Sequence, residues 1–143
     1  MKTMKNAGTL KPITVAAALV VLLLACGNSA QAWPQKTERV KMRDGVQLAT
    51  EIYLPMSYKE GKSYPVLLMR TPYGRKQWGD MLAAFVIPSG FILVSQDTRG
   101  RFDSEGFSAS FMDDAYDGYE TVQWVASQPW CRNGLVGTVG ISA

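Results

Sequence analysis

Two kinds of hydrophobic pattern follow one another along the chain. Apolar and polar residues alternate on both sides of Asp44-Gly45, which predicts an antiparallel β-hairpin over residues 40–52 with its turn at this dipeptide. Further on, continuous apolar runs occupy residues 66–69 and 91–94, and a third, mostly apolar run occupies residues 135–139. Each run has the length of a strand that is buried on both faces of a sheet.

The segments between the apolar runs predict helices. The first is expected over residues 78–85, before Pro88 and Gly90. The second begins at acidic residues 113, 114 and 117, which suit the positive end of the helix dipole, and it ends before Pro129. The apolar residues that recur at helical spacing in it are Ala115, Tyr119, Val122 and Val125 or Ala126. Strands that alternate with helices predict an α/β fold with a mostly parallel sheet and a leading antiparallel hairpin.

A dinucleotide-binding fold is the main alternative for such an order of elements. It is disfavoured, because no G-x-G-x-x-G follows any of the expected strands.

The first 32 residues have the pattern of a signal peptide. Lysines precede an apolar run over residues 13–25, which is short for a bilayer span, and the segment ends in the A-x-A-like Ala30-Gln31-Ala32. An uncleaved N-terminal anchor is one alternative. Another is a lipoprotein signal that ends before Cys26, in which Leu23-Leu24-Ala25-Cys26 is the lipobox, with Leu24 bulkier than usual there. Secretion and lipidation of Cys26 both place residues 33–143 outside the cytoplasm: periplasmic, secreted or anchored to a membrane through lipid.

Composition narrows the range of possible functions once residues 1–32 are set aside. The chain has 15 Lys and Arg against 12 Asp and Glu, a net charge of +3, and no histidine. The three lysines of residues 1–32 account for this excess, so residues 33–143 are formally neutral and no nucleic-acid partner is expected. With Cys26 in the signal, Cys131 is the other thiol, and we expect no disulfide, no cofactor and no metal site.

The last residues carry the first half of a nucleophile elbow. Gly140-Ile141-Ser142 follows the third apolar run, as in the G-x-S-x-G pattern, where a strained turn exposes the serine hydroxyl and points the next backbone N–H at the oxyanion. This pattern makes Ser142 the candidate nucleophile and the Ala143 N–H a candidate oxyanion donor. Since Gly-x-Ser after a strand is common, an ordinary turn serine is the alternative on this motif alone.

Five further motifs precede the elbow in order. They are Met-Arg-Asp-Gly-Val at 42–46, Arg-Thr-Pro-Tyr-Gly-Arg at 70–75, Gln-Asp-Thr-Arg-Gly-Arg at 96–101, Asp-Ser-Glu-Gly at 103–106 and Gln-Pro-Trp-Cys at 128–131. This series resembles the cocaine esterase and X-prolyl dipeptidyl peptidase family of α/β-hydrolases, over about residues 38–143. The resemblance implies that residues 33–143 are the truncated N-terminal part of an α/β-hydrolase catalytic domain, with the triad Asp and His beyond residue 143.

The resemblance also assigns roles to single residues. By position, the nucleophile falls on Ser142, and the oxyanion hole falls on the Ala143 N–H and on the hydroxyl of Tyr73, in the loop after the first apolar run. For Tyr73 the alternative is a packed loop aromatic. The family usually has Tyr where this chain has Ala143, a change that leaves the backbone donor in place but departs from the family at a position that bears on the subfamily and the substrate preference.

The implied activity is that of an exported serine hydrolase. It would cleave acyl esters or amides, X-Pro dipeptidyl amides among them, through an acyl-enzyme, so the expected partner is a small ester, amide or short peptide. The 143-residue chain by itself is expected to be inactive, because it lacks the histidine base. The alternative from another class is a non-catalytic α/β interaction module, exported or lipid-anchored. The sequence predicts no oligomeric state.

The remaining conspicuous side chains are expected to be structural. Charged residues of the loop after the second apolar run are expected to form ion pairs, not an acid/base pair or metal site: Asp97, Arg99, Arg101, Asp103 and Glu105. Trp124 and Trp130 are expected in the core, and Cys131 as a buried, unreactive thiol.

Overall fold

The predicted hairpin opens the fold. The computed structural model describes residues 33, 35–108, 114–140 and 142. Strands β1 (Gln35–Lys41) and β2 (Gln47–Tyr53) pair antiparallel, as predicted. Their turn is closed by the Gly45 N–H, which donates to the Met42 carbonyl at 2.9 Å, and Gly45 has a φ of 91°, a conformation that favours glycine.

The three apolar runs become three neighbouring parallel strands. They are β3 (Tyr64–Thr71), β4 (Ile92–Asp97) and β5 (Cys131–Thr138), in a five-stranded sheet of order β1-β2-β4-β3-β5. β3 pairs in parallel with both β4 and β5, whereas β2 pairs antiparallel with β4. The expected α/β class and the leading antiparallel hairpin are confirmed.

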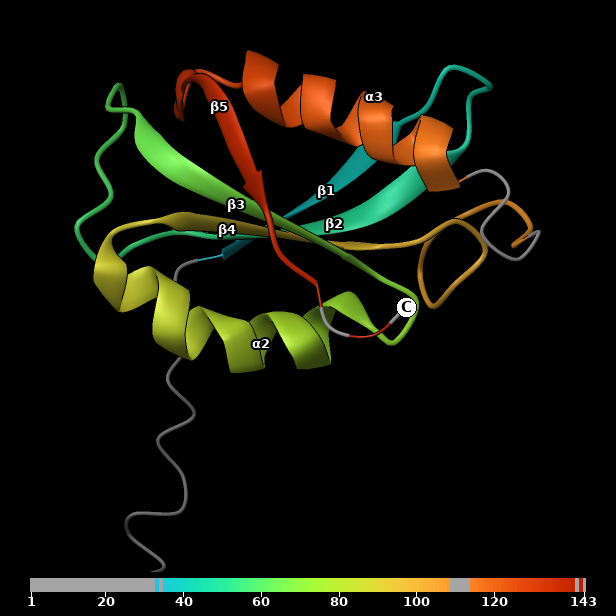
Figure 1. The fold of residues 1–143 in the computed structure, drawn as a ribbon, viewed down its shortest axis with the longest axis horizontal. Coiled ribbons are helices and arrows are strands. Elements are labelled where there is room, and N and C mark those ends of the chain that lie inside the picture. Colours follow the sequence, from blue (N-terminus) through green and yellow to red (C-terminus); the bar gives the residue numbers. More distant parts are fainter. Residues whose placement is uncertain (1–32, 34, 109–113, 141, 143) are drawn as a thin grey trace, which may run out of the picture. The chain divides into compact units, whose positions relative to one another are not determined.

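Two helices cover opposite faces of this sheet (Figure 1). Helix α2 (Arg75–Val86) leads from β3 towards β4 and continues into the 3₁₀ turn η1 (Ile87–Ser89), while α3 (Asp114–Ser127) precedes β5. Because β4 lies on one side of β3 and β5 on the other, right-handed crossovers place the two helices on opposite faces. The chain therefore changes the direction in which it crosses the sheet, from one side of β3 at β4 to the other side at β5. The carboxyl ends of strands at such a point form the usual ligand crevice of open α/β sheets.

Side chains of the central strands alternate between two apolar layers. Those of one layer pack against Val125 of α3, and those of the other against Ala83 and Val86 of α2. The α3 layer contains Ile52, Val66, Leu68, Ile92 and Val94, and the α2 layer contains Tyr53, Met69, Leu93 and Ile87. Burial on both faces explains why β3 and β4 contain uninterrupted apolar runs in the sequence.

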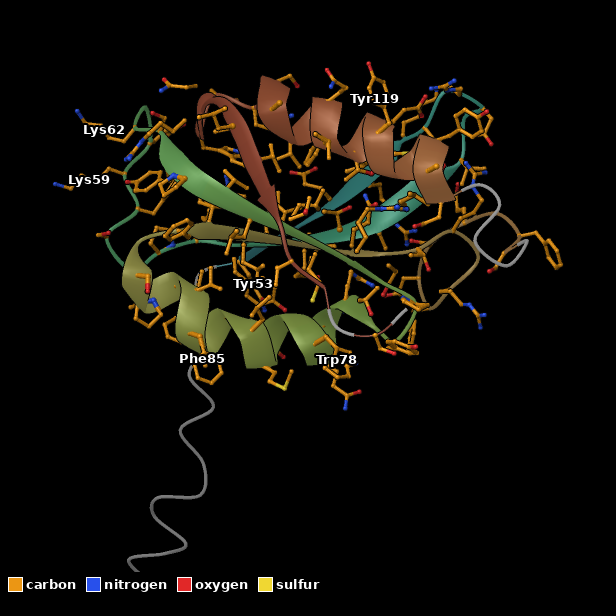
Figure 2. The ribbon with its side chains drawn as sticks, viewed as in Figure 1. Tyr53, Lys59, Lys62, Trp78, Phe85 and Tyr119 are labelled. Carbon is orange, nitrogen blue, oxygen red and sulfur yellow. The ribbon has the colours of Figure 1, made fainter. Side chains whose placement is uncertain are left out.

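The apolar residues that recur at helical spacing in α3 do not all face the sheet. Ala115 is exposed, and so is Tyr119, at 62%; its side chain lies on the outer side of the helix (Figure 2). The buried positions are Asp117, Thr121 and Val125, which share one face at four-residue spacing. Polar residues occupy this face because the strands and loops beneath it supply hydrogen-bond partners.

β5 also differs from its prediction. It begins before Asn133 and Gly134, which have φ values of 55° and 65° and lie where the pairing with β3 shifts between Tyr64 and Val66. Most of the strand is exposed, with Leu135 at 71%. The physical reason is its place as an outer strand of the described sheet, where apolar residues lack a neighbour on one side. Within the described ranges, no helix is both long and apolar enough to cross a membrane.

Candidate active site at the carboxyl edge of the sheet

Ser142 follows β5 in a strained backbone conformation. The Val139 N–H donates to the Leu68 carbonyl at 3.0 Å, so the chain stays beside β3 for one residue beyond the strand. Ser142 then has a φ of 70° and is exposed. L-residues other than Asn and Asp rarely hold this conformation, and a nucleophile elbow requires a sharp, strained turn at its serine. The local backbone therefore favours an elbow over an ordinary turn serine.

Tyr73 lies in the loop between β3 and α2. Its N–H donates to Thr71 Oγ1 at 3.1 Å, and its ring centroid lies 6.3 Å from that of Trp78. The side chain is 42% exposed, and among the described residues its hydroxyl forms no hydrogen bond. Because β3 and β5 are parallel neighbours, the segments after them emerge at the same sheet edge, as Figure 1 shows. The fold thus brings the Tyr73 loop and the Ser142 segment to one edge. Ala143 and Cys26 lie outside the described residues.

A buried ion pair joins the Tyr73 loop to the end of β4. Arg75, the first residue of α2, donates its backbone N–H to Asp97 Oδ1 at 2.6 Å and its Nη1 to Asp97 Oδ2 at 2.5 Å. The same Nη1 lies 2.8 Å from Asp103 Oδ2, and Arg75 Nε lies 3.4 Å from the buried Glu51 Oε2. Burial opposes the charge of Arg75, yet its hydrogen bonds with Asp103 and Asp97 raise its pKa above the ordinary value.

The pairing of Arg75 with Asp97 was not among the contacts predicted from the sequence. The available signal was the order of the two motifs, since Arg75 ends one, Asp97 is the second residue of the next, and both motifs lie at the ends of parallel neighbouring strands.

A second charged group joins the hairpin to α3. Arg99 donates Nε and Nη2 to the two oxygens of Asp117 at 2.9 and 2.7 Å, and Nη1 to Asp44 Oδ2 at 2.6 Å. Arg43 pairs with Glu120 beside them. These contacts raise the pKa of Arg99 and lower that of Asp44, in each case chiefly through the shared hydrogen bonds. Asp97, Arg99 and Asp103 thus all form the ion pairs expected of their loop, although Arg101 and Glu105 form none within the described ranges.

Two hollows of the surface are lined by side chains with structural roles. One of about 270 Å³ is lined by the Arg43, Arg99 and Asp117 group, whose charges are paired. Another of about 260 Å³ is lined in part by Trp124 and Trp130, which contact each other edge to face at 6.3 Å and pack against the α3 layer of the core. The two tryptophans are partly buried and serve packing, as expected.

Cys131 is also buried. Burial raises the pKa of its thiol, which donates weakly to the Leu135 carbonyl at 3.6 Å. A protonated, enclosed thiol is a poor nucleophile. In the part of the chain that the structure describes, no three Cys, Asp or Glu side chains are grouped to hold a metal ion.

The strand order, the antiparallel β2 and the strained serine after β5 together define the N-terminal portion of an α/β-hydrolase core. Residues 44–143 match the model of the family described as X-Pro dipeptidyl-peptidase (S15 family), and the chain belongs to this family.

Individual relatives agree with this assignment. Cocaine esterase from Rhodococcus sp. (strain MB1 Bresler) is 40% identical over 108 residues, which are 72% of this chain and 18% of that protein. The structure of an α-amino acid ester hydrolase has a TM-score of 0.61 and 29% identity over 80% of this chain and 22% of its own. For a CocE/NonD family hydrolase from Staphylococcus aureus, the TM-score is 0.60 and the identity 27%, over 73% and 22% of the chains.

The chain spans about a fifth of the length of these relatives. The family description names a peptidase, and these relatives are named as an esterase or as hydrolases.

Proposed function

We propose that this chain supplies the nucleophile and the oxyanion hole of an exported serine hydrolase, with the triad Asp and His encoded after residue 143. The observation that carries the proposal is Ser142, held at a φ of 70° shortly after β5, a parallel strand whose neighbour β3 leads into the Tyr73 loop. Strain of this kind persists where the surrounding structure holds it, and it concentrates at active sites.

The reaction follows from the chemistry of these groups. Ser142 Oγ attacks the carbonyl carbon of the substrate while the histidine takes the hydroxyl proton. The Ala143 N–H and the Tyr73 hydroxyl donate to the oxygen that becomes negative. The histidine then protonates the leaving alcohol or amine, which departs and leaves an acyl group on Ser142. Water, deprotonated by the same histidine, releases the acid and restores the serine.

Acyl esters of small molecules are the proposed substrates. The support comes from the relatives named as a cocaine esterase and an α-amino acid ester hydrolase, and the former is 40% identical. Amides of X-Pro dipeptides are the second candidate, since the family description names that activity.

Export is proposed from residues 1–32 alone. The basic start, the short apolar run and the small residues before Trp33 support a cleaved signal peptide, with lipidation at Cys26 as the alternative route. Metabolic labelling with a palmitate analogue separates the two, because lipidation at Cys26 retains the label and signal cleavage after Ala32 removes that residue.

Covalent labelling of Ser142 tests the proposed function. The full product of the reading frame that encodes this chain is incubated with a fluorophosphonate probe, with Ser142→Ala as the control. We expect label on the unaltered protein alone, and hydrolysis of a p-nitrophenyl ester that Ser142→Ala abolishes. Absence of label on a folded product would overturn the nucleophile assignment and favour a non-catalytic interaction module.

A further inference from the structure

We propose that Asp97 is a positioning residue for the loop over residues 71–75 and that it sets the place of Tyr73 through Arg75. The inference rests on the proposed roles of Ser142 and Tyr73. Asp97 itself acts at a distance from the reacting atoms, because its carboxylate is engaged by Arg75 and has no exposed surface.

One carboxylate holds both the backbone and the side chain of Arg75. Asp97 Oδ1 accepts the Arg75 N–H at 2.6 Å, and Asp97 Oδ2 accepts Arg75 Nη1 at 2.5 Å. The two side chains are 0% and 4% exposed, so little water competes for these bonds. Ser95 contributes a third hydrogen bond, since its Oγ donates to the Arg75 carbonyl at 2.8 Å. The residue two positions after Tyr73 is therefore fixed to β4 by three hydrogen bonds.

The other end of the loop is fixed to the same strand end. The Thr98 N–H donates to the Thr71 carbonyl at 3.1 Å, and Thr71 Oγ1 accepts the Tyr73 N–H at 3.1 Å. Between these ends, Gly74 has a φ of 106°, and a Cβ placed there would lie 3.1 Å from the Phe102 ring. The loop has little room to shift unless the Arg75 anchor is released.

Position matters for a donor of this kind. An oxyanion donor is effective only about 2.7–3.1 Å from the charged oxygen. A displacement of roughly 1 Å can cost about a hundredfold in rate. Asp97 would thus contribute to kcat through Tyr73, with little effect on substrate affinity.

Asp103 provides a matched control. It accepts from the same Arg75 Nη1 at 2.8 Å, but its side chain is 55% exposed and it does not accept the backbone N–H of Arg75. Asp103→Asn therefore removes a similar charge from Arg75 and leaves the loop anchor intact.

A double-mutant cycle in the full product of the reading frame tests the inference. We expect Tyr73→Phe to lower kcat by about 10²–10³-fold. Asp97→Asn places an amide nitrogen against one of the two Arg75 donors, and we expect a fall in kcat on the order of ten- to a hundredfold, with KM changed less than about twofold. Added to Tyr73→Phe, it is expected to lower kcat by less than about twofold more. Asp103→Asn should stay within about twofold of the unaltered enzyme.

Amide hydrogen exchange provides a readout that needs no catalysis. Peptides covering residues 71–78 should exchange faster in Asp97→Asn and at the original rate in Asp103→Asn. If Asp97→Asn does not fold, Ser95→Ala replaces it, since it removes one neutral hydrogen bond to the Arg75 carbonyl and should act in the same direction with smaller size.

The two measurements separate failure of this inference from failure of the proposed function. Ester hydrolysis that survives Ser142→Ala would refute the function, and the exchange data would still decide whether Asp97 holds the loop. If Ser142→Ala and Tyr73→Phe both reduce activity as expected, the positioning role is refuted in either of two cases. One is that Asp97→Asn lowers kcat equally with and without the Tyr73 hydroxyl, and the other is that it leaves exchange of residues 71–78 unchanged.

Discussion

Backbone strain in this molecule lies at a few identifiable residues. Outside glycine, positive φ values occur among the described residues at Phe102, Asn133 and Ser142, at 47°, 55° and 70°. Asparagine tolerates this region, whereas a bulky aromatic is a genuine outlier there. Phe102 and Ser142 both follow strands at the carboxyl edge, so the strained non-asparagine positions fall where the candidate site is. That distribution is typical of a functional edge in a fold whose other turns use glycine.

Gly79 shows how closely one residue can be constrained. It lies inside α2, where alanine ordinarily stabilises a helix by about 1 kcal/mol. Here a Cβ would lie 2.6 Å from the hydroxyl of Tyr53, a fully buried ring that extends from the sheet towards α2 (Figure 2). We expect Gly79→Ala to reverse the usual gain and to lower the free energy of unfolding by about 1–3 kcal/mol, measured by urea denaturation.

Gly118→Ala is the control for this prediction. Gly118 lies inside α3, and the nearest atom to its Cβ would be Arg70 Nη1, the end of a long side chain, at 3.1 Å. We expect Gly118→Ala to lower the free energy of unfolding by a smaller amount, or not at all. Equal losses at the two glycines would mean that the contact with Tyr53 is not the cause.

At the scale of elements, local patterns predicted much of the fold. The hairpin, β3, β4 and both helices lie close to where alternation, apolar runs and helical spacing placed them, because each of these signals reports burial of neighbouring residues, whereas the exposed β5 begins earlier than predicted. The candidate role of Ser142 came from a local motif and that of Tyr73 from the family resemblance, and both stay predictions. The orientation of α3 was not predictable in this way. Its buried face is polar, because Asp117 and Thr121 bond to Arg99 and Gln96, 18 and 25 residues away in the sequence.

The Arg75–Asp97 pair was missed for the same reason. Each residue was visible as a charged member of a motif, but the partnership depends on β3 and β4 being parallel neighbours. Long-range polar contacts leave no periodicity in the sequence, so they become visible only once the strand order is known.

Ion pairs join the hairpin turn to α3: Arg99 pairs with Asp44 and Asp117, and Arg43 pairs with Glu120. The stabilisation that they give to the fold should depend on pH. Arg99 lowers the pKa of Asp44 below its ordinary 3.8, and Arg43 lowers that of Glu120 below 4.5, mainly by hydrogen bonding. A carboxylate whose pKa is lower in the folded state stabilises it above the ordinary pKa, and this stabilisation is lost as the pH falls through the folded value. We therefore expect Arg99→Gln to destabilise the fold at pH 7 and pH 5, with the difference from the unaltered chain narrowing towards pH 3.

Urea denaturation at pH 7, 5 and 3 measures this difference. Arg101→Gln is the control, since Arg101 is exposed and forms no ion pair within the described ranges. Its effect should be small and independent of pH. A constant gap between Arg99→Gln and the unaltered chain down to pH 3 would show that Arg99 acts through packing and not through its carboxylate partners.

In the described unit as a whole, the candidate catalytic residues lie at one edge of the sheet, and the outer strand β5 is largely exposed. The Tyr73 loop, the charged loop after β4 and Ser142 all follow the carboxyl ends of parallel strands. β5, which positions Ser142, is also an outer strand with an exposed apolar side chain at Leu135. An exposed apolar edge strand is a template for pairing with other chains.

This arrangement predicts that residues 33–143 expressed alone self-associate through β5. Leu135 is 71% exposed on that strand, and a lysine there would oppose edge-to-edge pairing. Phe85, 74% exposed on α2, offers a matched apolar-to-lysine change away from any strand edge. We expect Leu135→Lys to raise the concentration at which light scattering detects aggregates by several-fold, and Phe85→Lys to have much less effect. If both changes raise this concentration equally, general surface hydrophobicity causes the association. The reason is that only Leu135→Lys alters a strand edge whose backbone groups could pair with a new strand.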